Sequence, residues 1–425
     1  MKDYDDTAPA SGIEDWCDRH SSLIEEYALQ IVSIPSPQPE GDVRGVADKL
    51  AEIASTIPGV RIERYISEEP VHNLVLTLAG SRPGPRLIFN GHTDTFPLGN
   101  LDTWSKNPWG EVAGDRIYGL GISDMKGGLA ASLFALKCLA ECQPDFPGEI
   151  VCTFAGDEET MGALGTKYLL ESVPHARGDA MISGDVGSPS ILRVGEKGMI
   201  WATLRATGQS AHAAHVHKGD SAIEKLTAAM ARISELREWE VSDAAPDVHT
   251  LIDRWSEASE SLSGPGETEV LKSVTVTFGT FNGGRLPNLV ADAAEMSVDI
   301  RLPVGVAVAD IEAHLERICA GIDGVTLEIT RRFEPSWTDP ESSIVTTVRN
   351  ACAHVLEDEI AVTMRVGASD ARLYRYAGVP SVVCGLTPFN MGAADEYILR
   401  DELSALGKIF ALSALHFLSG QSPTR

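Results

Sequence analysis

The stretch Glu149–Gly162, EIVCTFAGDEETMG, joins a short apolar run to an unusual group of acids. The apolar half is typical of a buried strand. The second half places three carboxylates side by side behind it, at Asp157, Glu158 and Glu159. Like charges this close repel, and burial strengthens the repulsion unless protons or cations relieve it. The stretch therefore predicts a cation site at the end of a strand.

Helices and strands alternate on both sides of this stretch. The alternation predicts a mostly parallel sheet covered by helices, in which sites form beyond the carboxyl ends of the strands. His92, Asp185 and the acidic triplet all follow strand-like runs, so we expect them at one edge. The helices are expected over 13–32, 43–57, 126–142 and 164–172, and the strands over 61–66, 73–80, 86–92, 149–156 and 180–185.

From Gly198 the order of elements changes to β-α-β-β-α-β, the ferredoxin-like arrangement. A polar connection over 237–272 interrupts it and is expected to be a surface insertion. The first rhythm then resumes. We therefore predict an α/β catalytic domain, residues 1–197 and 333–425, split by an inserted lid and dimerisation domain, residues 198–332.

Composition narrows the choice of partners and compartment. The chain has 425 residues, and its formal net charge of −26 argues against binding to nucleic acid or anionic membranes. No apolar run reaches the roughly 18 residues that a membrane span needs. The start lacks the layout of a secretion signal. The seven cysteines form no CxxC pair, which favours reduced thiols and a cytoplasmic protein.

Four short motifs at strand ends carry the candidate site: NGHTDTFP, GISDMKGG, GDEET and ISGDVG. One imidazole with several carboxylates is a suitable ligand set for zinc or manganese. Singly, each motif has a simpler explanation, such as a surface turn, a solvated loop or a helix cap. Their joint placement favours a metal site. The candidate ligands are His92, Asp124, Asp185 and Glu159.

Two further acids have predicted roles beside these ligands. Asp94 follows His92 by two residues and can accept the other ring N–H of that imidazole, which fixes its tautomer. Glu158 stays free to take and return a proton while Glu159 faces the metal.

The chain resembles the metallopeptidase family that includes aminoacylases, acetylornithine deacetylase, succinyl-diaminopimelate desuccinylase and carboxypeptidase G. The string GHTDTFP, then PWGEVAGDRIYGLGISDMKGGLAAS, then FAGDEETMGALGT carries the resemblance, which runs from about Ile13 to the C-terminus. It implies that His92 and Asp185 bind one metal and Asp124 bridges two, often beside a cis peptide. It further implies that Glu159 serves the second metal, Glu158 is the general base and Asp157 is structural.

The resemblance also covers the inserted domain. It implies that His212 reaches the active site of a partner subunit and polarises the substrate there, so that a homo-oligomer, at least a dimer, is expected. Asn288 and Arg301 would bind oxygens or a carboxylate of a small-molecule substrate, and Gly367 and Ser369 would touch its tail. A structural ion pair is an equal alternative for Arg301.

Two departures from the family pattern stand out. Leu120 replaces an arginine, and Gly392 stands where the family has a histidine, three residues before an acidic pair. Without that imidazole the second metal keeps only Asp124 and Glu159, a thin ligand set. We therefore expect one divalent transition metal (Mn, Zn or Co) and a weak or absent second site. Tyr397 is a possible substitute ligand.

One metal still suffices for hydrolysis of a C–N bond in a small carboxylate-bearing substrate. It lowers the pKa of a water, and Glu158 passes the proton to the leaving nitrogen. A single metal suits a substrate that stabilises its own negative charge, so we expect release of ammonia from 5-nitroanthranilate to give 5-nitrosalicylate by nucleophilic aromatic substitution. The alternatives are an N-acyl amino acid deacylase or desuccinylase, an aminopeptidase-like amidohydrolase, and a non-catalytic ligand-binding protein.

Overall fold

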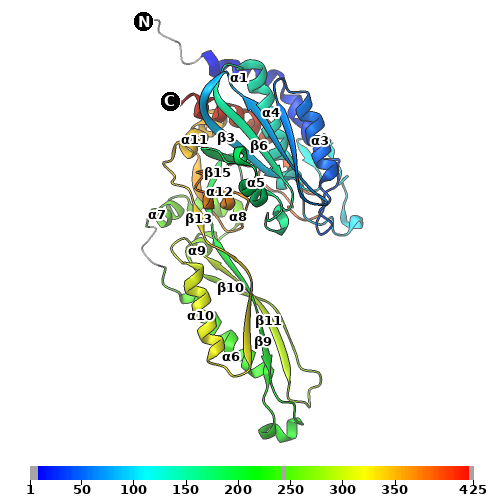
Figure 1. The fold of residues 1–425 in the computed structure, drawn as a ribbon, viewed down its shortest axis with the longest axis vertical. Coiled ribbons are helices and arrows are strands. Elements are labelled where there is room, and N and C mark those ends of the chain that lie inside the picture. The colour runs from blue at the N-terminus through cyan, green and yellow to red at the C-terminus, as the bar shows by residue number, and fades with distance from the viewer. Residues whose placement is uncertain (1–7, 242–245, 421–425) are drawn as a thin grey trace. The chain divides into compact units, whose positions relative to one another are not determined.

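The computed structural model describes residues 8–241 and 246–420 (Figure 1). The chain divides into two compact units, each considered by itself. The first comprises residues 1–194, 338–363 and 369–425, and the second comprises 195–337 and 364–368. The predicted divisions at 197/198 and 332/333 lie close to the observed ones at 194/195 and 337/338, but the short return of 364–368 was not foreseen.

The first unit is built on a large sheet in the order β1-β2-β6-β3-β7-β15-β8. Its centre is parallel, because β3 pairs in parallel with β6 and β7, and β15 with β7; the strands outside these pair antiparallel. The predicted mainly parallel sheet is thus confirmed. The strands are β1 (Arg61–Glu68), β2 (Val71–Ala79), β3 (Arg82–His92), β6 (Pro147–Ala155), β7 (Ala180–Ser183), β8 (Ile191–Glu196), β14 (Ala361–Arg365) and β15 (Ser381–Val383).

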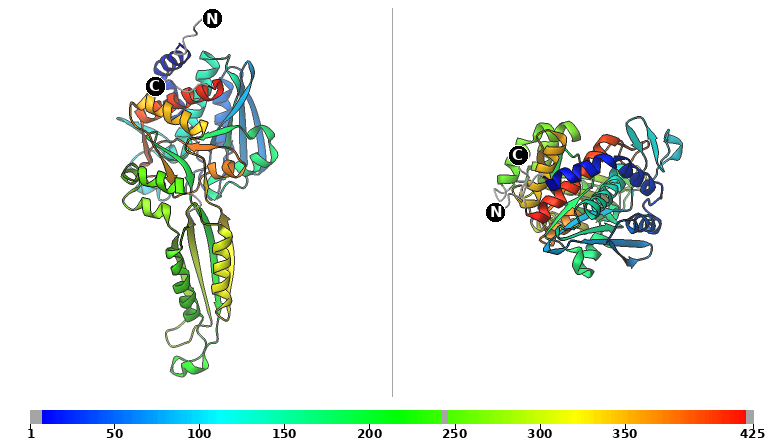
Figure 2. Two further views of the ribbon diagram at one scale, coloured as in Figure 1. Left: turned by 90° about the vertical axis from the view of Figure 1, so that its left-hand side faces the viewer. Right: turned by 90° about the horizontal axis from the view of Figure 1, so that it is seen from above.

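Helices cover both faces of this sheet. Ile88 on β3 packs in one cluster with Leu169 and Tyr374, whereas the next residue, Phe89, stacks on Phe410 of α13 with ring centroids 5.1 Å apart. Burial on both faces explains why the strands read as continuous apolar runs. Figure 2 shows the red helix α13 beside the blue helix α1. The helices are α1 (Ala8–Arg19), α2 (Ser21–Val32), α3 (Arg44–Ser55), α4 (Gly127–Cys142), α5 (Thr166–Ser172), α11 (Ser343–Leu356), α12 (Ala371–Tyr376) and α13 (Arg400–Ser419).

A small antiparallel sheet, in the order β16-β5-β4, also belongs to the first unit. It places Tyr397 opposite Tyr118. Its strands are β4 (Glu111–Ala113), β5 (Arg116–Tyr118) and β16 (Tyr397–Leu399).

The second unit has the predicted β-α-β-β-α-β order. Its antiparallel sheet runs β10-β11-β9-β12, the strand order of a ferredoxin-like fold. The helices α6 and α10 lie along the strands (Figure 1) and bury a core that includes Ile200, Leu226, Ile300 and Leu315. The elements are β9 (Gly198–Thr207), α6 (Ala222–Ser234), β10 (Thr275–Gly283), β11 (Ala293–Leu302), α10 (Val308–Ala320), β12 (Val325–Phe333) and β13 (Ser336–Trp337).

Two local expectations differ from the structure. The helix expected over 13–32 is broken into α1 and α2 at His20, whose backbone (φ −113°, ψ 19°) is not helical. The polar stretch over 237–272, expected as a surface insertion, contains three helices. Val248 and Ile252, one turn apart, bury one side of the first of them, and Leu271 is buried on the third. These helices are α7 (Pro246–Arg254), α8 (Ser256–Ser263) and α9 (Glu267–Lys272).

Two findings bear on the expectations about compartment. All seven cysteines are free thiols. Among residues 8–241 and 246–420, no helix has both the length and the apolar character that a membrane crossing requires.

Candidate metal centre and active site

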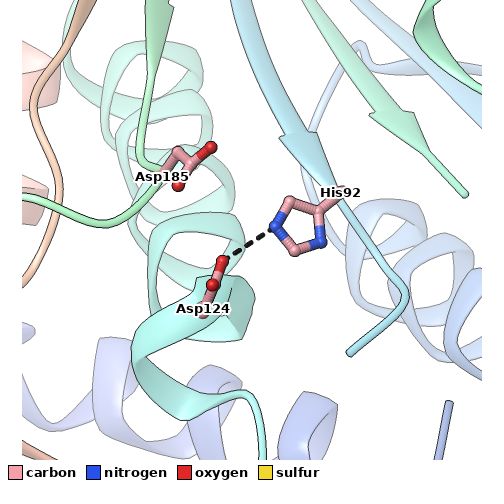
Figure 3. Close-up of side chains that lie close together, drawn as sticks. All are labelled: His92, Asp124 and Asp185. Atoms are coloured by element: carbon pink, nitrogen blue, oxygen red, sulfur yellow. Dashed lines mark hydrogen bonds and ion pairs between the residues drawn. The ribbon is translucent and has the colours of Figure 1, made fainter. Parts of the chain in front are cut away.

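Three side chains from separate parts of the chain converge at the carboxyl ends of the parallel strands (Figure 3). His92 ends β3, Asp124 lies in the turn before α4, and Asp185 follows β7. One ligand atom from each lies within 4.8 Å of the other two. His92 Nε2 is 2.9 Å from Asp124 Oδ1. The structure thus brings together the three residues predicted to hold the first metal.

Close backbone packing positions two of these ligands. The N-terminus of α4 approaches the end of β7 so closely that a Cβ on Gly128 would lie 2.3 Å from the carbonyl oxygen of Gly184. Gly128 at the start of α4 therefore has no room for a side chain. The Asp124–Met125 peptide is cis, as the family resemblance implied.

Glu396 holds the turn that carries Asp124. Its Oε2 accepts a hydrogen bond from the Gly121 N–H (3.0 Å), and its Oε1 accepts bonds from the N–H and hydroxyl of Ser123 (2.9 and 2.7 Å). The side chain is 1% exposed. In the sequence this residue served only to mark the position of Gly392, and its supporting role was missed.

The contact between His92 and Asp94 is made differently from the prediction. His92 Nδ1 lies 2.9 Å from the main-chain oxygen of Asp94 and 3.6 Å from its carboxylate oxygen Oδ1. The carboxylate instead accepts the N–H groups of Glu158 and Glu159, both at 3.1 Å, and the Gln38 side-chain amide at 3.0 Å. Because the acidic loop offers two N–H groups, Asp94 fixes that loop as well as the imidazole.

Glu158 and Glu159 lie in a single turn (Glu158–Thr160) after β6. Burial raises the pKa of Glu158 well above its ordinary value, and the charges of Asp370 and Asp185 raise it further. Burial, with a contribution from Asp124, raises the pKa of Glu159 to about 9. Glu158 therefore lies in surroundings that favour a proton, as a group that accepts and returns protons requires.

Asp157 has the structural role that the resemblance implied. It adopts the left-handed backbone conformation (φ 75°), and its carboxylate accepts the Leu164 N–H (2.8 Å) and the Thr160 hydroxyl. These contacts fold the loop so that the next two residues can turn away from each other.

The donor set suits a divalent cation. Burial by itself would lower the pKa of His92, but the carboxylates of Asp124 and Asp94 overcome this and raise the pKa well above its usual value. These surroundings favour a proton on the His92 imidazole, which offsets the negative charge of the two carboxylates. A bound cation would offset the same charge. Buried Glu159 Oε1 has no hydrogen-bond partner among the described residues. Glu159 does not belong to the group of His92, Asp124 and Asp185, whose ligand atoms lie within 4.8 Å of one another.

Two positions were linked in the sequence to a second metal. Gly392 has the left-handed conformation (φ 68°), and a Cβ there would lie 3.6 Å from the Phe96 ring. Tyr397 stacks on Phe389 with ring centroids 4.6 Å apart and lies beneath the guanidinium of Arg116 at 4.4 Å. Tyr397 is thus held in an aromatic and cationic stack.

Of the predicted substrate residues in the second unit, His212 and Asn288 lie beside each other, whereas Arg301 forms an ion pair. His212 is exposed, and its Nδ1 accepts the Ala214 N–H (3.1 Å), so the ring is oriented by its own turn. The carbonyl of Asn288 accepts the Ala213 N–H (3.0 Å), which places Asn288 beside His212. Arg301 instead donates twice to Asp299, at 2.8 and 2.9 Å. Gly367 packs with the second unit and Ser369 with the first.

Two buried charges near the site were missed in the sequence. Arg372 on α12 lies 3.9 Å from Glu158 Oε1, and Asp370 accepts the Thr166 hydroxyl at 2.6 Å. Burial raises the pKa of Asp370 to about 6. The available signal was an arginine between two apolar residues, Ala371 and Leu373, both of which are buried.

A buried imidazole and two carboxylates at strand ends, with a glutamate beside them, form the kind of site that metal-dependent hydrolases use. Residues 88–416 match Peptidase family M20/M25/M40, and the chain belongs to this family. It is therefore a metallohydrolase, as the sequence resemblance indicated.

Known relatives span nearly the whole chain. A succinyl-diaminopimelate desuccinylase of Methylorubrum extorquens is 28% identical over 411 residues, covering 92% of this chain and 97% of the relative. The M20 metallo-carboxypeptidase Sso-CP2 of Sulfolobus solfataricus shares the fold with a TM-score of 0.77 at 19% identity, over 93% of this chain and 99% of that one. A dinuclear metal-binding M20 peptidase of Bacillus subtilis has a TM-score of 0.64 at 14% identity, over 94% and 99%.

Proposed function

We propose that this protein is an amidohydrolase that removes the acyl group from a small N-acyl amino acid with a free carboxylate. The convergence of His92, Asp124 and Asp185 beside buried Glu158 is the observation that carries the proposal. The whole-length similarity to a desuccinylase supports this substrate class. It favours the deacylase, which the sequence left as an alternative, over the expected action on 5-nitroanthranilate.

A divalent cation held by His92, Asp124 and Asp185 would lower the pKa of a water molecule and polarise the scissile carbonyl. Glu158 accepts the proton of the attacking water and delivers it to the leaving nitrogen. Its raised pKa matches both steps, because such a carboxyl can hold the proton between them. Asp94 keeps the base in place through the Glu158 N–H.

The second unit supplies the substrate contacts in this proposal. His212 and Asn288 are exposed on one small region, where they can meet an oxygen of the substrate held by a partner subunit. We propose a homodimer as the active form for this reason. Arg301 can bind a substrate carboxylate in this proposal only if it gives up part of its bidentate pair with Asp299.

One observation keeps a second candidate function open, the release of ammonia from 5-nitroanthranilate. Gly392 has no side chain that could bind a cation, Tyr397 is held in its stack on Phe389, and Glu159 is not in the group of His92, Asp124 and Asp185. A site with one cation stabilises less negative charge on the substrate. A nitro group para to the amine would carry that charge itself.

A substrate panel separates the two candidates. N-succinyl-L,L-diaminopimelate, other N-succinyl and N-acetyl amino acids, and 5-nitroanthranilate are each incubated with the protein in manganese, zinc or cobalt. We expect release of the free amino group from at least one acylated substrate and loss of most turnover in E158Q. E171Q, which changes an exposed glutamate, is the control. D157N is unsuitable as a control, because it would disturb the loop that carries Glu158. Ammonia release from the nitroaromatic alone would replace the first candidate by the second.

A further inference from the structure

We infer that Arg372 is a positioning residue for Glu158: it anchors the turn that carries this base and sets a fixed positive charge beside its carboxylate. The inference rests on the proposed function, since it assumes that Glu158 transfers protons. It assigns a role to a buried residue for which the sequence suggested none.

The burial of Arg372 is unusual for an arginine. The side chain is 1% exposed and belongs to the largest fully buried side chains of the chain. Arginine is almost never buried to this extent without partners, because removing a guanidinium from water is costly. Four of the six residues of α12 are buried, Arg372 among them, so this charge lies inside the unit and requires partners there.

The hydrogen bonds of Arg372 join two loops that border the base. Nη2 donates to the main-chain oxygen of Met161 (2.8 Å), and Nη1 donates to that of Ser369. Met161 closes the turn of Glu158, since its N–H donates to the Glu158 carbonyl (2.6 Å). Met161 also has the left-handed backbone conformation (φ 90°), which a side chain other than glycine adopts only under strain. The guanidinium thus holds a strained residue three positions after Glu158, in the same turn.

The distance between the guanidinium and the base is suited to this role. Nη1 lies 3.9 Å from Glu158 Oε1, too far for a hydrogen bond but close enough for attraction between the charges. A bidentate pair would occupy both carboxylate oxygens. Because Nη1 and Nη2 donate to two carbonyl groups, the guanidinium lies beside the Glu158 carboxylate without binding it directly.

Steady-state kinetics test the inference, with the acylated amino acid of the panel on which the wild type has the highest kcat/KM. We expect R372Q to lower kcat by about 100-fold and to change KM by less than about threefold, since a misplaced base affects the chemical step. R372K keeps the charge and should recover at least about tenfold of this loss. In the E158Q background, R372Q should lower the residual kcat by less than about threefold, because its effect acts through Glu158.

Several outcomes would overturn the inference. An unchanged kcat in R372Q does so, and so does an equal further loss when R372Q is added to E158Q. R193Q removes another buried arginine, on β8 at 4% exposure, and serves as the matched control. A kcat loss in R193Q as large as in R372Q would mean that burial of any such charge is enough to explain the effect. If E158Q itself keeps full activity, the base of the proposed function is wrong instead.

A readout without turnover keeps the test independent of substrate choice. Hydrogen–deuterium exchange of the segment 157–164 should rise in R372Q, while the bound metal measured by mass spectrometry stays as in the wild type. If exchange in this segment equals that of the wild type, Arg372 does not anchor the turn and the inference falls, whatever the panel shows.

Discussion

The Glu158 N–H donates to Asp94 Oδ1 at 3.1 Å, so a residue that contacts the candidate ligand His92 also holds the main chain of the proposed base. The second oxygen of Asp94 accepts the Glu159 N–H. One buried carboxylate therefore fixes both halves of the active site relative to each other. Since this link is made through the backbone of the glutamates, it is invisible in the spacing of the motifs.

We expect D94N to weaken both halves together. An amide NH₂ cannot accept the N–H that one carboxylate oxygen now receives, which leaves a buried donor unpaired and costs about 1–3 kcal/mol of unfolding free energy. Metal affinity should fall by about 10–100-fold, because the negative charge 3.6 Å from the His92 imidazole is lost. Urea unfolding and metal titration measure the two effects. D102N changes an exposed aspartate and should do neither; equal losses in D102N would contradict the assignment.

We expect replacement of a carboxylate by an amide to have different effects at the two acidic neighbours Asp395 and Glu396. Glu396 accepts three hydrogen bonds from the turn that carries Asp124, so E396Q should lower the affinity for manganese or zinc by about tenfold or more. Asp395 instead accepts the N–H groups of Ser105 and Lys106, at 2.8 and 2.9 Å, far along the chain from any ligand. D395N is therefore the matched control and should lower stability only. Metal titration of the two variants decides, and equal affinities would refute the role of Glu396.

The fold and the convergence of the candidate ligands were predictable because their signals are local. Apolar runs that end in His92, Glu158 and Asp185 place these residues at strand ends, and parallel strands bring their ends together. The supporting residues were not predictable in the same way. Glu396 and Arg372 act through main-chain N–H and C=O groups of distant loops, and almost every residue type offers those groups. The spacing of residue types in a sequence therefore cannot reveal a hydrogen bond whose partner is a main-chain group.

The inserted helices α7–α9 show a different limit. Their polar composition suggested a surface connection, yet a few apolar residues such as Ile252 and Leu271 suffice to bury one side. Helices this short depend on packing more than on propensity, so sequence pattern alone underestimates them. The break at His20 is the reverse case, since the apolar spacing continues across a residue whose backbone leaves the helix.

Lys197 predicts that stability rises with pH in a defined window. It is 3% exposed, and its ammonium donates to the carbonyl groups of Val270 and, at 2.7 Å, Ser273. Burial, with the nearby charge of Arg301, lowers the pKa of Lys197 from 10.5 to about 7. The unfolded chain therefore binds more protons than the folded one between about pH 7 and 10.5, so the unfolding free energy rises with pH there, by at most about 1.4 kcal/mol per unit.

Urea unfolding of the wild type and K197M at pH 6, 7.5 and 9 measures this contribution. The difference between wild type and K197M should shift in favour of the wild type as the pH rises from 7.5 to 9, and it should stay constant below about pH 7. K225M removes a lysine whose ammonium pairs with Asp220 and serves as the control, with no such pH-dependent shift expected. A pH-independent difference for K197M would show that the amine keeps its ordinary pKa.

Gly392 predicts the number of metal ions that the chain holds. We expect the wild type to retain one equivalent of manganese or zinc after dialysis and G392H to retain close to two, because the new imidazole would join Asp124 and Glu159 as a ligand. A histidine fits, since its Cβ would meet the Phe96 ring at 3.6 Å, an ordinary contact. The left-handed backbone (φ 68°) costs a side chain about 1 kcal/mol, so stability should fall slightly. G392N is the control, because asparagine can adopt this conformation at a similar cost but is a poor metal ligand. We expect G392N to retain one equivalent of metal. Two equivalents already retained by the wild type would show that Glu159 and Asp124 complete the second site without an imidazole from position 392.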